Sequence, residues 1–234
     1  MSIRPRKKGL FYMRMRKKKN GAARIEACRE LLITEVESLK EDPQYAFAKK
    51  RPLHLEIGCG KGSFACGMAK ANPAVNFIAM EKVPDVACLA LEKAKKCAEE
   101  RDDNLRFLIG DAKNLTEWFP KGSIDCIYLN FSDPWPKSGH AKRRLTYHTF
   151  LALYQELLVP NGVLAFKTDN MGLFDFSVEE FEAFGLETEW ITRDLHASEH
   201  NEGNVMTEYE TLFSSKGQPI YAARLRFPIK ETKE

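Results

Sequence analysis

Hydrophobic residues recur along the chain in two alternating patterns. Short apolar runs bounded by turn residues predict β-strands at 53–57, 75–80, 105–109, 124–129, 162–167, 187–193 and 220–227. Between them, apolar residues three or four positions apart predict helices at 63–70, 84–99, 147–158, 178–184 and 208–214. The same spacing at Ile25, Cys28, Leu32, Val36 and Leu39 predicts a further amphipathic helix over 22–39.

This alternation is typical of an α/β fold in which helices cover both faces of a mainly parallel sheet. The last two strand-like segments alternate polar and apolar residues, as a strand near a sheet edge or in an antiparallel pair does. We therefore expect a mostly parallel, seven-stranded sheet with one antiparallel strand in the edge region. Residues 21–234 show no internal repeat and are predicted to form a single domain.

Composition narrows the class of protein. The chain has 234 residues, 44% of them hydrophobic, which is enough for a core of its own. No apolar run approaches the roughly 18 residues of a membrane span, and no signal-peptide pattern is present. The six cysteines include no Cys-x-x-Cys pair, which favours a reducing, cytoplasmic setting. His196 and His200 lie four residues apart without an evident third ligand, so no metal site is expected.

Charge is distributed unevenly along the chain. Residues 1–19 hold nine of the 36 basic residues and no acidic residue, so the remainder carries a net charge of −6. Like charges at this density repel one another, and 1–20 is predicted to form a flexible basic arm. Such an arm on an acidic body suits contact with a phosphate backbone. A solubility tail is the alternative.

A glycine-rich segment follows the strand predicted at 53–57. It spans 56–62 and reads EIGCGKG. Gly58, Gly60 and Gly62 let the backbone turn sharply and approach a ligand closely. Loops of this kind bind adenosine-containing cofactors at the carboxyl edge of a sheet. The spacing differs from the dinucleotide fingerprint, because Ser63 stands where that pattern has its third glycine.

Carboxylates end three successive predicted strands. Glu56 precedes the glycine loop, Glu81 closes the second strand, and Asp111 follows the third. Glu81 is placed to accept hydrogen bonds from ribose hydroxyls, and Asp111 from an adenine amino group. A pyrophosphate cofactor would be repelled by Glu56, whereas the sulfonium and ammonium groups of S-adenosylmethionine would be attracted. A helix cap or a surface charge is the alternative for any one acid alone.

The most distinctive segment is 130–144, which reads NFSDPWPKSGHAKRR. An acid, two prolines and a tryptophan directly after a buried strand predict a stiff, partly apolar lip. The cations Lys137, Lys142, Arg143 and Arg144 follow within a few residues. Together they suit a pocket for a flat polar ring carried on a polyanion. Packing at a sheet edge and a solvated helix start are the alternatives.

These segments resemble class I S-adenosylmethionine-dependent methyltransferases and, more closely, the bacterial tRNA (guanine-N7-)-methyltransferase family. The resemblance covers nearly everything from Met13 onward and is carried by residues 56–62, 128–137, 140–144, 166–170 and 202–210. It implies a Rossmann-like fold, S-adenosylmethionine as the cofactor and tRNA as the partner. The implied reaction is methylation at N7 of a guanine in the tRNA variable loop. Both a monomer and a homodimer are compatible with it.

The resemblance also implies roles for individual positions. The cofactor is expected at Glu56, Gly58, Gly60, Gly62, Glu81, Asp111 and Asp133. The substrate guanosine is expected at Lys137, Asp169, Thr207, Glu208, Tyr209 and Glu210. RNA contact is expected at Gly139, His140, Ala141, Lys142, Arg143 and Arg144. The family usually has an arginine where this chain has Gly139, so one phosphate contact is in question.

The chemistry assigns Asp133 to the junction between cofactor and guanine, where its carboxylate would stabilise the developing cationic ring. Guanine N7 carries no proton, so no general base has to remove one. Asp169 and Glu210 are candidates to accept hydrogen bonds from guanine N1–H and the amino group. Trp135 and Tyr209 could stack on a base.

Three other functions are compatible with parts of this pattern. A small-molecule or protein methyltransferase could share the fold. An RNA-binding module could retain a vestigial cofactor site, although the acids at 56, 81, 111 and 133 argue against it. A dinucleotide-dependent oxidoreductase is disfavoured by the glycine spacing.

Overall fold

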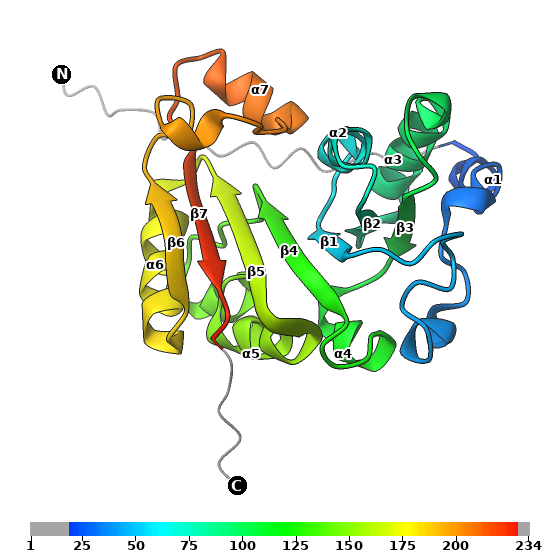
Figure 1. The fold of residues 1–234 in the computed structure, drawn as a ribbon. Helices are drawn as coiled ribbons and strands as arrows, with labels where there is room; N and C mark the ends of the chain where they lie inside the picture. Colours follow the sequence, from blue (N-terminus) through cyan, green and yellow to red (C-terminus); the bar gives the residue numbers. More distant parts are fainter. Residues whose placement is uncertain (1–18, 229–234) are drawn as a thin grey trace, which may run out of the picture.

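The computed structural model describes residues 19–228, so most of the basic arm predicted over 1–20 lies outside the described residues. Seven strands form one sheet in the order β3-β2-β1-β4-β5-β7-β6 (Figure 1). The first four are β1 (Leu53–Ile57), β2 (Asn76–Glu81), β3 (Leu105–Ile109) and β4 (Ile124–Asn130). The others are β5 (Leu158–Thr168), β6 (Glu187–Thr192) and β7 (Tyr221–Arg226).

The sheet is parallel except for one strand. β1 pairs in parallel with β2 and β4, β2 with β3, and β4 with β5. β7 runs antiparallel to both of its neighbours, β5 and β6. The reversed strand therefore stands next to the edge, and the predicted fold class is confirmed.

Helices cover both faces of the sheet. Phe64 and Leu91, from α2 (Ser63–Ala71) and α3 (Pro84–Lys96), belong to the apolar cluster on one face, beside the short α1 (Gly21–Glu26). The other face packs on α4, α5 and α6, with Tyr154 and Phe174 fully buried. These helices span Leu115–Trp118, His148–Leu157 and Met171–Phe184, while α7 (Glu208–Ser214) lies above the carboxyl edge (Figure 1).

The predicted helix over 22–39 is wrong. Only α1 is helical there, followed by 3₁₀ turns at Arg29–Leu31 and Val36–Lys40. Between these turns, Leu32 forms a parallel bridge with Phe107, and the Ile33 N–H donates to the Phe107 carbonyl at 2.8 Å. The chain is therefore extended beside β3. The apolar spacing correctly indicates buried positions, since Leu39 is fully buried. Pairing with β3 nevertheless outweighs the helix propensity of this segment.

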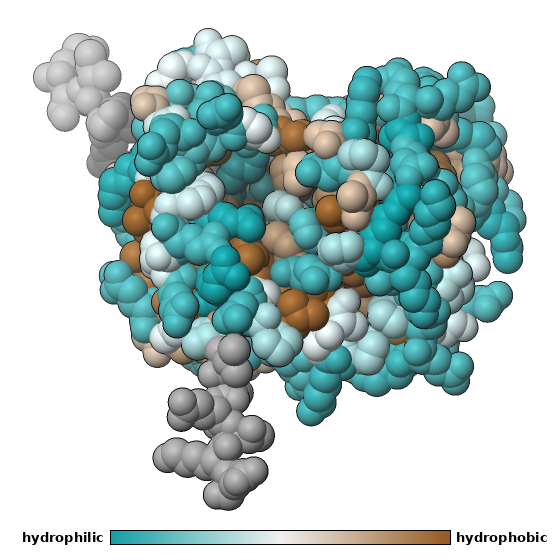
Figure 2. Space-filling model, in the orientation of Figure 1, coloured by the Kyte–Doolittle hydropathy of each residue, from teal (hydrophilic) through white to brown (hydrophobic). Residues whose placement is uncertain are grey.

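The surface in the view of Figure 2 is mostly hydrophilic, and hydrophobic residues gather in the hollow at its centre. A cavity of about 240 Å³ lies on the α2 side of the sheet, with Phe64, Met68 and Tyr128 in its wall. All six cysteines are free. Within residues 19–228 no helix is long and apolar enough to cross a membrane.

Candidate active site

The glycine loop joins β1 to α2 through a turn that suits glycine alone. Gly58, Gly60 and Gly62 have φ angles of 80°, 57° and 77°. This left-handed region strains residues that carry a Cβ. At Gly62 a Cβ would also come within 2.9 Å of the Ala90 Cβ in α3. Glycine is therefore favoured at all three positions, and at Gly62 the contact with Ala90 leaves no room for a Cβ.

Two carboxylates follow the next strands. Glu81 ends β2 and accepts hydrogen bonds from the backbone N–H groups of Gly60 at 3.1 Å and Val83 at 2.9 Å. Asp111 follows β3 and lies 2.7 Å from the Lys82 Nζ. Burial raises the pKa of Glu81. Burial is the largest single effect on Asp111 and raises its pKa, but the hydrogen bonds and charges of Lys82 and Lys113 together outweigh it, so the pKa of that carboxyl is lowered.

A cavity of about 540 Å³ opens at the carboxyl ends of β1 to β4. Glu81, Asp111 and Asp133 line it together with Gly58. The apolar part of the wall includes Phe131 and other residues of the lip. A volume of this size is typical of small-molecule and cofactor pockets. The structure thus gathers four predicted cofactor residues around one space, while the rest of the glycine loop lies beside it.

Glu56 stands one residue before the cavity wall and is only 4% exposed. One of its oxygens accepts from the Asn130 side-chain amide at 3.0 Å. Its other oxygen is buried and finds no hydrogen-bond partner within residues 19–228. Burial raises the pKa of Glu56 to about 7. An unmatched buried acceptor suits a cationic donor brought by a ligand, as S-adenosylmethionine would bring.

Asp133 lies on a strained lip that follows β4. Phe131 and Trp135, on either side of it, have φ angles of 52° and 40°. Such angles are uncommon for bulky residues and concentrate at functional sites. Partial burial raises the pKa of Asp133, and no ion pair holds it among the described residues. Its carboxylate is therefore free to face a ligand in the cavity.

Two arginines of the predicted RNA segment brace this lip. The Arg143 guanidinium lies 4.8 Å from the centre of the Trp135 ring. Arg144 donates to the carbonyls of Pro134 at 3.1 Å and Trp135 at 3.0 Å. It also lies 4.1 Å from the centre of the Phe176 ring. Both arginines are thus partly engaged in holding the lip, which a simple solvated basic run would not do.

The remaining residues of this segment face outward. Lys137, Gly139 and Lys142 are exposed, and a 3₁₀ turn spans Ser138–Arg143. His140 packs edge-on against Trp135, with ring centres 5.7 Å apart. A Cβ at Gly139 would meet nothing within 4 Å. A side chain can therefore begin at position 139 without a clash at its Cβ.

Asp169 and the predicted substrate residues at 207–210 lie near the carboxyl edge of the sheet, after β5 and at the start of α7 (Figure 1). Asp169 follows β5, and burial raises its pKa. Thr207 caps α7, accepting from the Glu210 N–H at 2.9 Å. Tyr209 is 54% exposed and lies 5.9 Å, centre to centre, from the ring of Phe131 on the lip. Helix α7 thus brings its first residues next to the cavity.

Glu210 does not face the cavity, although the sequence analysis considered it as a hydrogen-bond acceptor for guanine. It is fully buried, and both of its oxygens are engaged inside the protein. One oxygen is 2.7 Å from the Lys167 Nζ, and the other accepts from Asn204 at 2.6 Å and lies 3.0 Å from His196 Nε2. The direct bond to guanine that we considered for Glu210 is therefore not available in this arrangement.

Comparison with known proteins identifies the family. A family model described as "Putative methyltransferase" matches residues 50–223. A tRNA (guanine-N(7)-)-methyltransferase from Limosilactobacillus reuteri (strain DSM 20016) is 51% identical over 89% of this chain and 97% of its own length. Another, from Geobacillus sp. (strain WCH70), is 46% identical over 94% of this chain and 99% of its own. The chain belongs to the tRNA (guanine-N7-)-methyltransferase family. The resemblance inferred from its sequence segments is confirmed, and the protein is a methyltransferase enzyme.

Solved structures agree on the fold. The 16S rRNA methyltransferase KamB superposes with a TM-score of 0.58 at 12% identity, over 83% of this chain and 92% of that one. The aminoglycoside resistance methyltransferase NpmB1 has a TM-score of 0.53 at 17% identity, over 80% and 92%. At these identities the likeness supports the Rossmann-like architecture alone.

Two polar residues that lie in the segments carrying the resemblance, but to which the sequence analysis gave no role, hold buried glutamates near the site. Asn130 ends β4 and holds Glu56. Lys167, in β5, holds Glu210. Both stand near the end of apolar strands and are buried, at 7% and 8% exposure. A buried polar residue inside an otherwise apolar run was the available signal.

The two histidines considered as metal ligands lie in separate environments. His196 contacts Glu210, whereas His200 stacks on Trp190 with ring centres 4.3 Å apart. Within residues 19–228 no group of three or more potential ligands gathers around one point.

Proposed function

We propose that the protein transfers the methyl group of S-adenosylmethionine to N7 of a guanine in the variable loop of tRNA. Family membership supplies the reaction class. The observation that carries the proposal is the arrangement of one cavity. Acids from successive strand ends line it, and its lip continues directly into the basic segment at residues 137–144.

The acids would hold the cofactor by charge and hydrogen bonding. Glu81 would accept from the ribose hydroxyls, Asp111 from the adenine amino group, and the unmatched oxygen of Glu56 from the ammonium group. Gly58, Gly60 and Gly62 would let the backbone approach closely. When bound, S-adenosylmethionine supplies an electrophilic methyl group on a positively charged sulfur. The residues in place match this cation far better than a pyrophosphate.

The guanine would enter past Asp133. Its N7 has a lone pair and no proton, so the protein needs to position the base and stabilise positive charge on the product ring. Asp133 would stabilise that charge, because electrostatic interactions strengthen in a partly buried site. Asp169 would accept from the guanine N1–H or amino group, and Tyr209 would stack on the base. Thr207 and Glu208 would border the base on the same side.

The outward face of the lip would contact the RNA backbone. His140 and Lys142 would contact phosphates, and Arg143 and Arg144 would share that role while bracing the lip. Lys137 would reach the substrate guanosine. Gly139 and Ala141 would allow close backbone approach. Binding through phosphates predicts that tRNA affinity falls steeply with salt. A cytoplasmic location, the basic arm's contact with RNA and the oligomeric state remain predictions.

Methyl transfer from labelled S-adenosylmethionine to unmodified tRNA tests the function directly. The tRNA is digested, and the modified nucleoside is identified and placed by mass spectrometry. N7-methylguanosine in the variable loop is the expected product. Cofactor binding without transfer would overturn the proposal and indicate another substrate or a non-catalytic RNA-binding role.

Asp133→Asn tests the assigned centre, with Asp102→Asn as the matched control. Asp102 is an exposed carboxylate paired with Arg51 before β3 begins, at the opposite edge of the sheet. We expect Asp133→Asn to lower kcat by about 100-fold, the usual effect of removing one electrostatic stabiliser. Near-normal turnover in a folded Asp133→Asn protein would remove this residue from the mechanism.

A further inference from the structure

Lys167 is the penultimate residue of β5 and is 8% exposed. A buried ammonium group is costly unless charge and hydrogen bonds compensate it. Burial indeed lowers the pKa of Lys167, although Glu210 opposes this shift. A lysine in such a position requires a dense set of acceptors to remain charged.

One short segment supplies those acceptors. The Lys167 Nζ donates to Glu210 Oε2 at 2.7 Å, to Asn204 Oδ1 at 3.0 Å and to the Val205 carbonyl at 3.0 Å. The ring of Phe64 lies beneath it at 5.1 Å. The three acceptors use all three ammonium hydrogens. Lys167, together with Asn204 and His196, holds the pKa of Glu210 below its usual value against the effect of burial.

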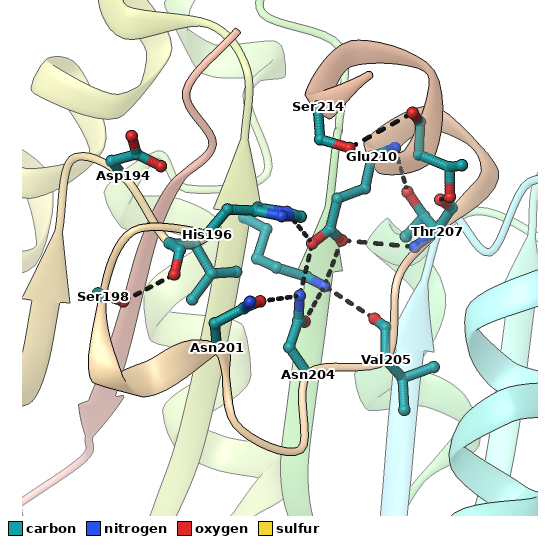
Figure 3. A network of polar contacts seen from close by, with 12 residues as sticks. Asp194, His196, Ser198, Asn201, Asn204, Val205, Thr207, Glu210 and Ser214 are labelled. Carbon is teal, nitrogen blue, oxygen red and sulfur yellow. Dashed lines mark hydrogen bonds and ion pairs between the residues drawn. The ribbon is translucent and has the colours of Figure 1, made fainter. Parts of the chain in front are cut away.

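The same segment is connected within itself through Glu210 (Figure 3). Asn204 and His196 contact one carboxylate oxygen, and the Thr207 N–H approaches the other at 3.4 Å. Val205 also packs so closely on α2 that a Cβ at Gly67 would lie 2.6 Å from it. The pair between Lys167 and Glu210 thus joins the loop before α7 to the sheet.

This loop determines where the first residues of α7 lie. Tyr209 is placed next to Phe131 on the cavity lip. Glu208 reaches the glycine loop and its surroundings, pairing with Lys61 and Lys93. Because Lys167 fixes the loop from below, the positions of both side chains depend on an ammonium group that faces away from solvent.

We propose that Lys167 is a positioning residue for the substrate: with Glu210 it locks residues 204–210 over the carboxyl edge of the sheet so that Tyr209 and Glu208 can border the guanine. The inference rests on the proposed function and extends it to a residue that would not touch either reactant. It predicts that loss of the pair impairs the use of tRNA while cofactor binding is retained.

Lys167→Met and the double variant Lys167→Met/Glu210→Gln test the inference, with Lys121→Met as the matched control. The double variant avoids a buried unpaired carboxylate, so it remains informative if the single variant fails to fold. Lys121 is 79% exposed and pairs with Glu156, before the start of β4. Measurements on each protein are cofactor affinity by calorimetry, kcat and KM for tRNA, and hydrogen exchange by mass spectrometry.

We expect kcat/KM for tRNA to fall by about 100-fold in both Lys167 variants, the cost of misplacing reacting groups by roughly 1 Å. The KM for tRNA should rise, and at pH 8 cofactor affinity should fall by far less than kcat/KM for tRNA, although loss of the Lys167 charge also acts on Glu56. Faster exchange should be confined to residues 202–212. Unchanged kcat/KM, unchanged exchange, or equal losses of cofactor and tRNA binding would overturn the inference. A wild-type protein that forms no N7-methylguanosine would instead defeat the proposed function, while exchange would still test the positioning role.

Discussion

The carboxyl edge of the sheet holds two buried glutamates in opposite states. On the cofactor side, Glu56 accepts one hydrogen bond, keeps one oxygen unmatched, and has its pKa raised to about 7 by burial. On the substrate side, Glu210 has both oxygens engaged, and its pKa lies below the usual value. Both carboxylates are buried, and their opposite pairing suits Glu56 to a ligand and Glu210 to stabilising the fold.

The largest expected effect comes from breaking the paired side. Glu210→Ala leaves the Lys167 ammonium buried without its counter-charge, which typically costs 3–5 kcal/mol, so we expect a loss of about 4 kcal/mol in the free energy of unfolding. Urea denaturation at pH 7.5 measures it. Glu156→Ala, which removes an exposed carboxylate paired with Lys121, is the control and should change stability by less than about 1 kcal/mol. Equal losses in both variants would contradict the distinction.

Glu56→Gln should act in the opposite direction. Because the folded pKa is raised, ionisation of Glu56 costs stability, and this cost grows as pH rises from the unfolded value of about 4.5 to about 7. Without cofactor, the variant should be more stable than wild type at pH 8 by up to about 3 kcal/mol, and nearly equal at pH 4.5. Denaturation at both pH values provides the measurement. A variant less stable at pH 8 would show that Glu56 is structurally paired after all.

Cofactor affinity should depend on pH through the same carboxyl. Ionised Glu56 attracts an ammonium group and the protonated form does not, so affinity for S-adenosylmethionine should weaken below pH 7, approaching tenfold per pH unit. Calorimetric titrations between pH 5.5 and 8 would reveal the slope. In Glu56→Gln the slope should be reduced and the affinity low throughout. A slope that persists unchanged in that variant would assign the titration to another group.

The smallest effect is expected at Gly139, in the exposed part of the predicted RNA-binding segment, where a substitution should change tRNA affinity. Gly139→Arg should restore one phosphate contact, tightening tRNA binding a few-fold and steepening the dependence of log affinity on log salt by about 0.9. The open space around Gly139 allows a Cβ there without a clash. Gly139→Glu is the matched control and should weaken binding. Identical salt slopes in the two variants would place position 139 away from the RNA backbone.

Much of the fold could be predicted because local patterns agreed with the final structure. The strand at 105–109 and the helix at 208–214 have the predicted bounds. Other boundaries moved where a distant or capping contact intervened. Helix α6 begins at Met171 rather than 178 because the Asn170 side chain accepts from the Leu173 N–H at 2.8 Å. Strand β5 begins at Leu158 rather than at the predicted 162.

In the site, too, local features could be predicted from the sequence and long-range contacts could not. Acids at strand ends could be read from the sequence, because parallel strands bring their carboxyl ends to one edge. The pairing of Glu210 with Lys167 could not, since 43 residues separate the partners. The sequence contained both side chains, but whether a buried carboxylate is matched or unmatched depends on contacts that form only in the folded sheet.

Strand β7 follows β6 in the chain yet lies between β5 and β6 in the sheet. During translation, Glu187–Thr192 therefore emerges from the ribosome before its sheet neighbour exists. The segment between β6 and β7 contains the partners of Lys167. Both ends of this segment are held in the sheet only after β7 has paired with β5 and β6. We expect a nascent chain to assemble β1 to β5 and the acidic cofactor edge first. The residues proposed to hold the guanine would therefore be fixed only after β7 has joined the sheet.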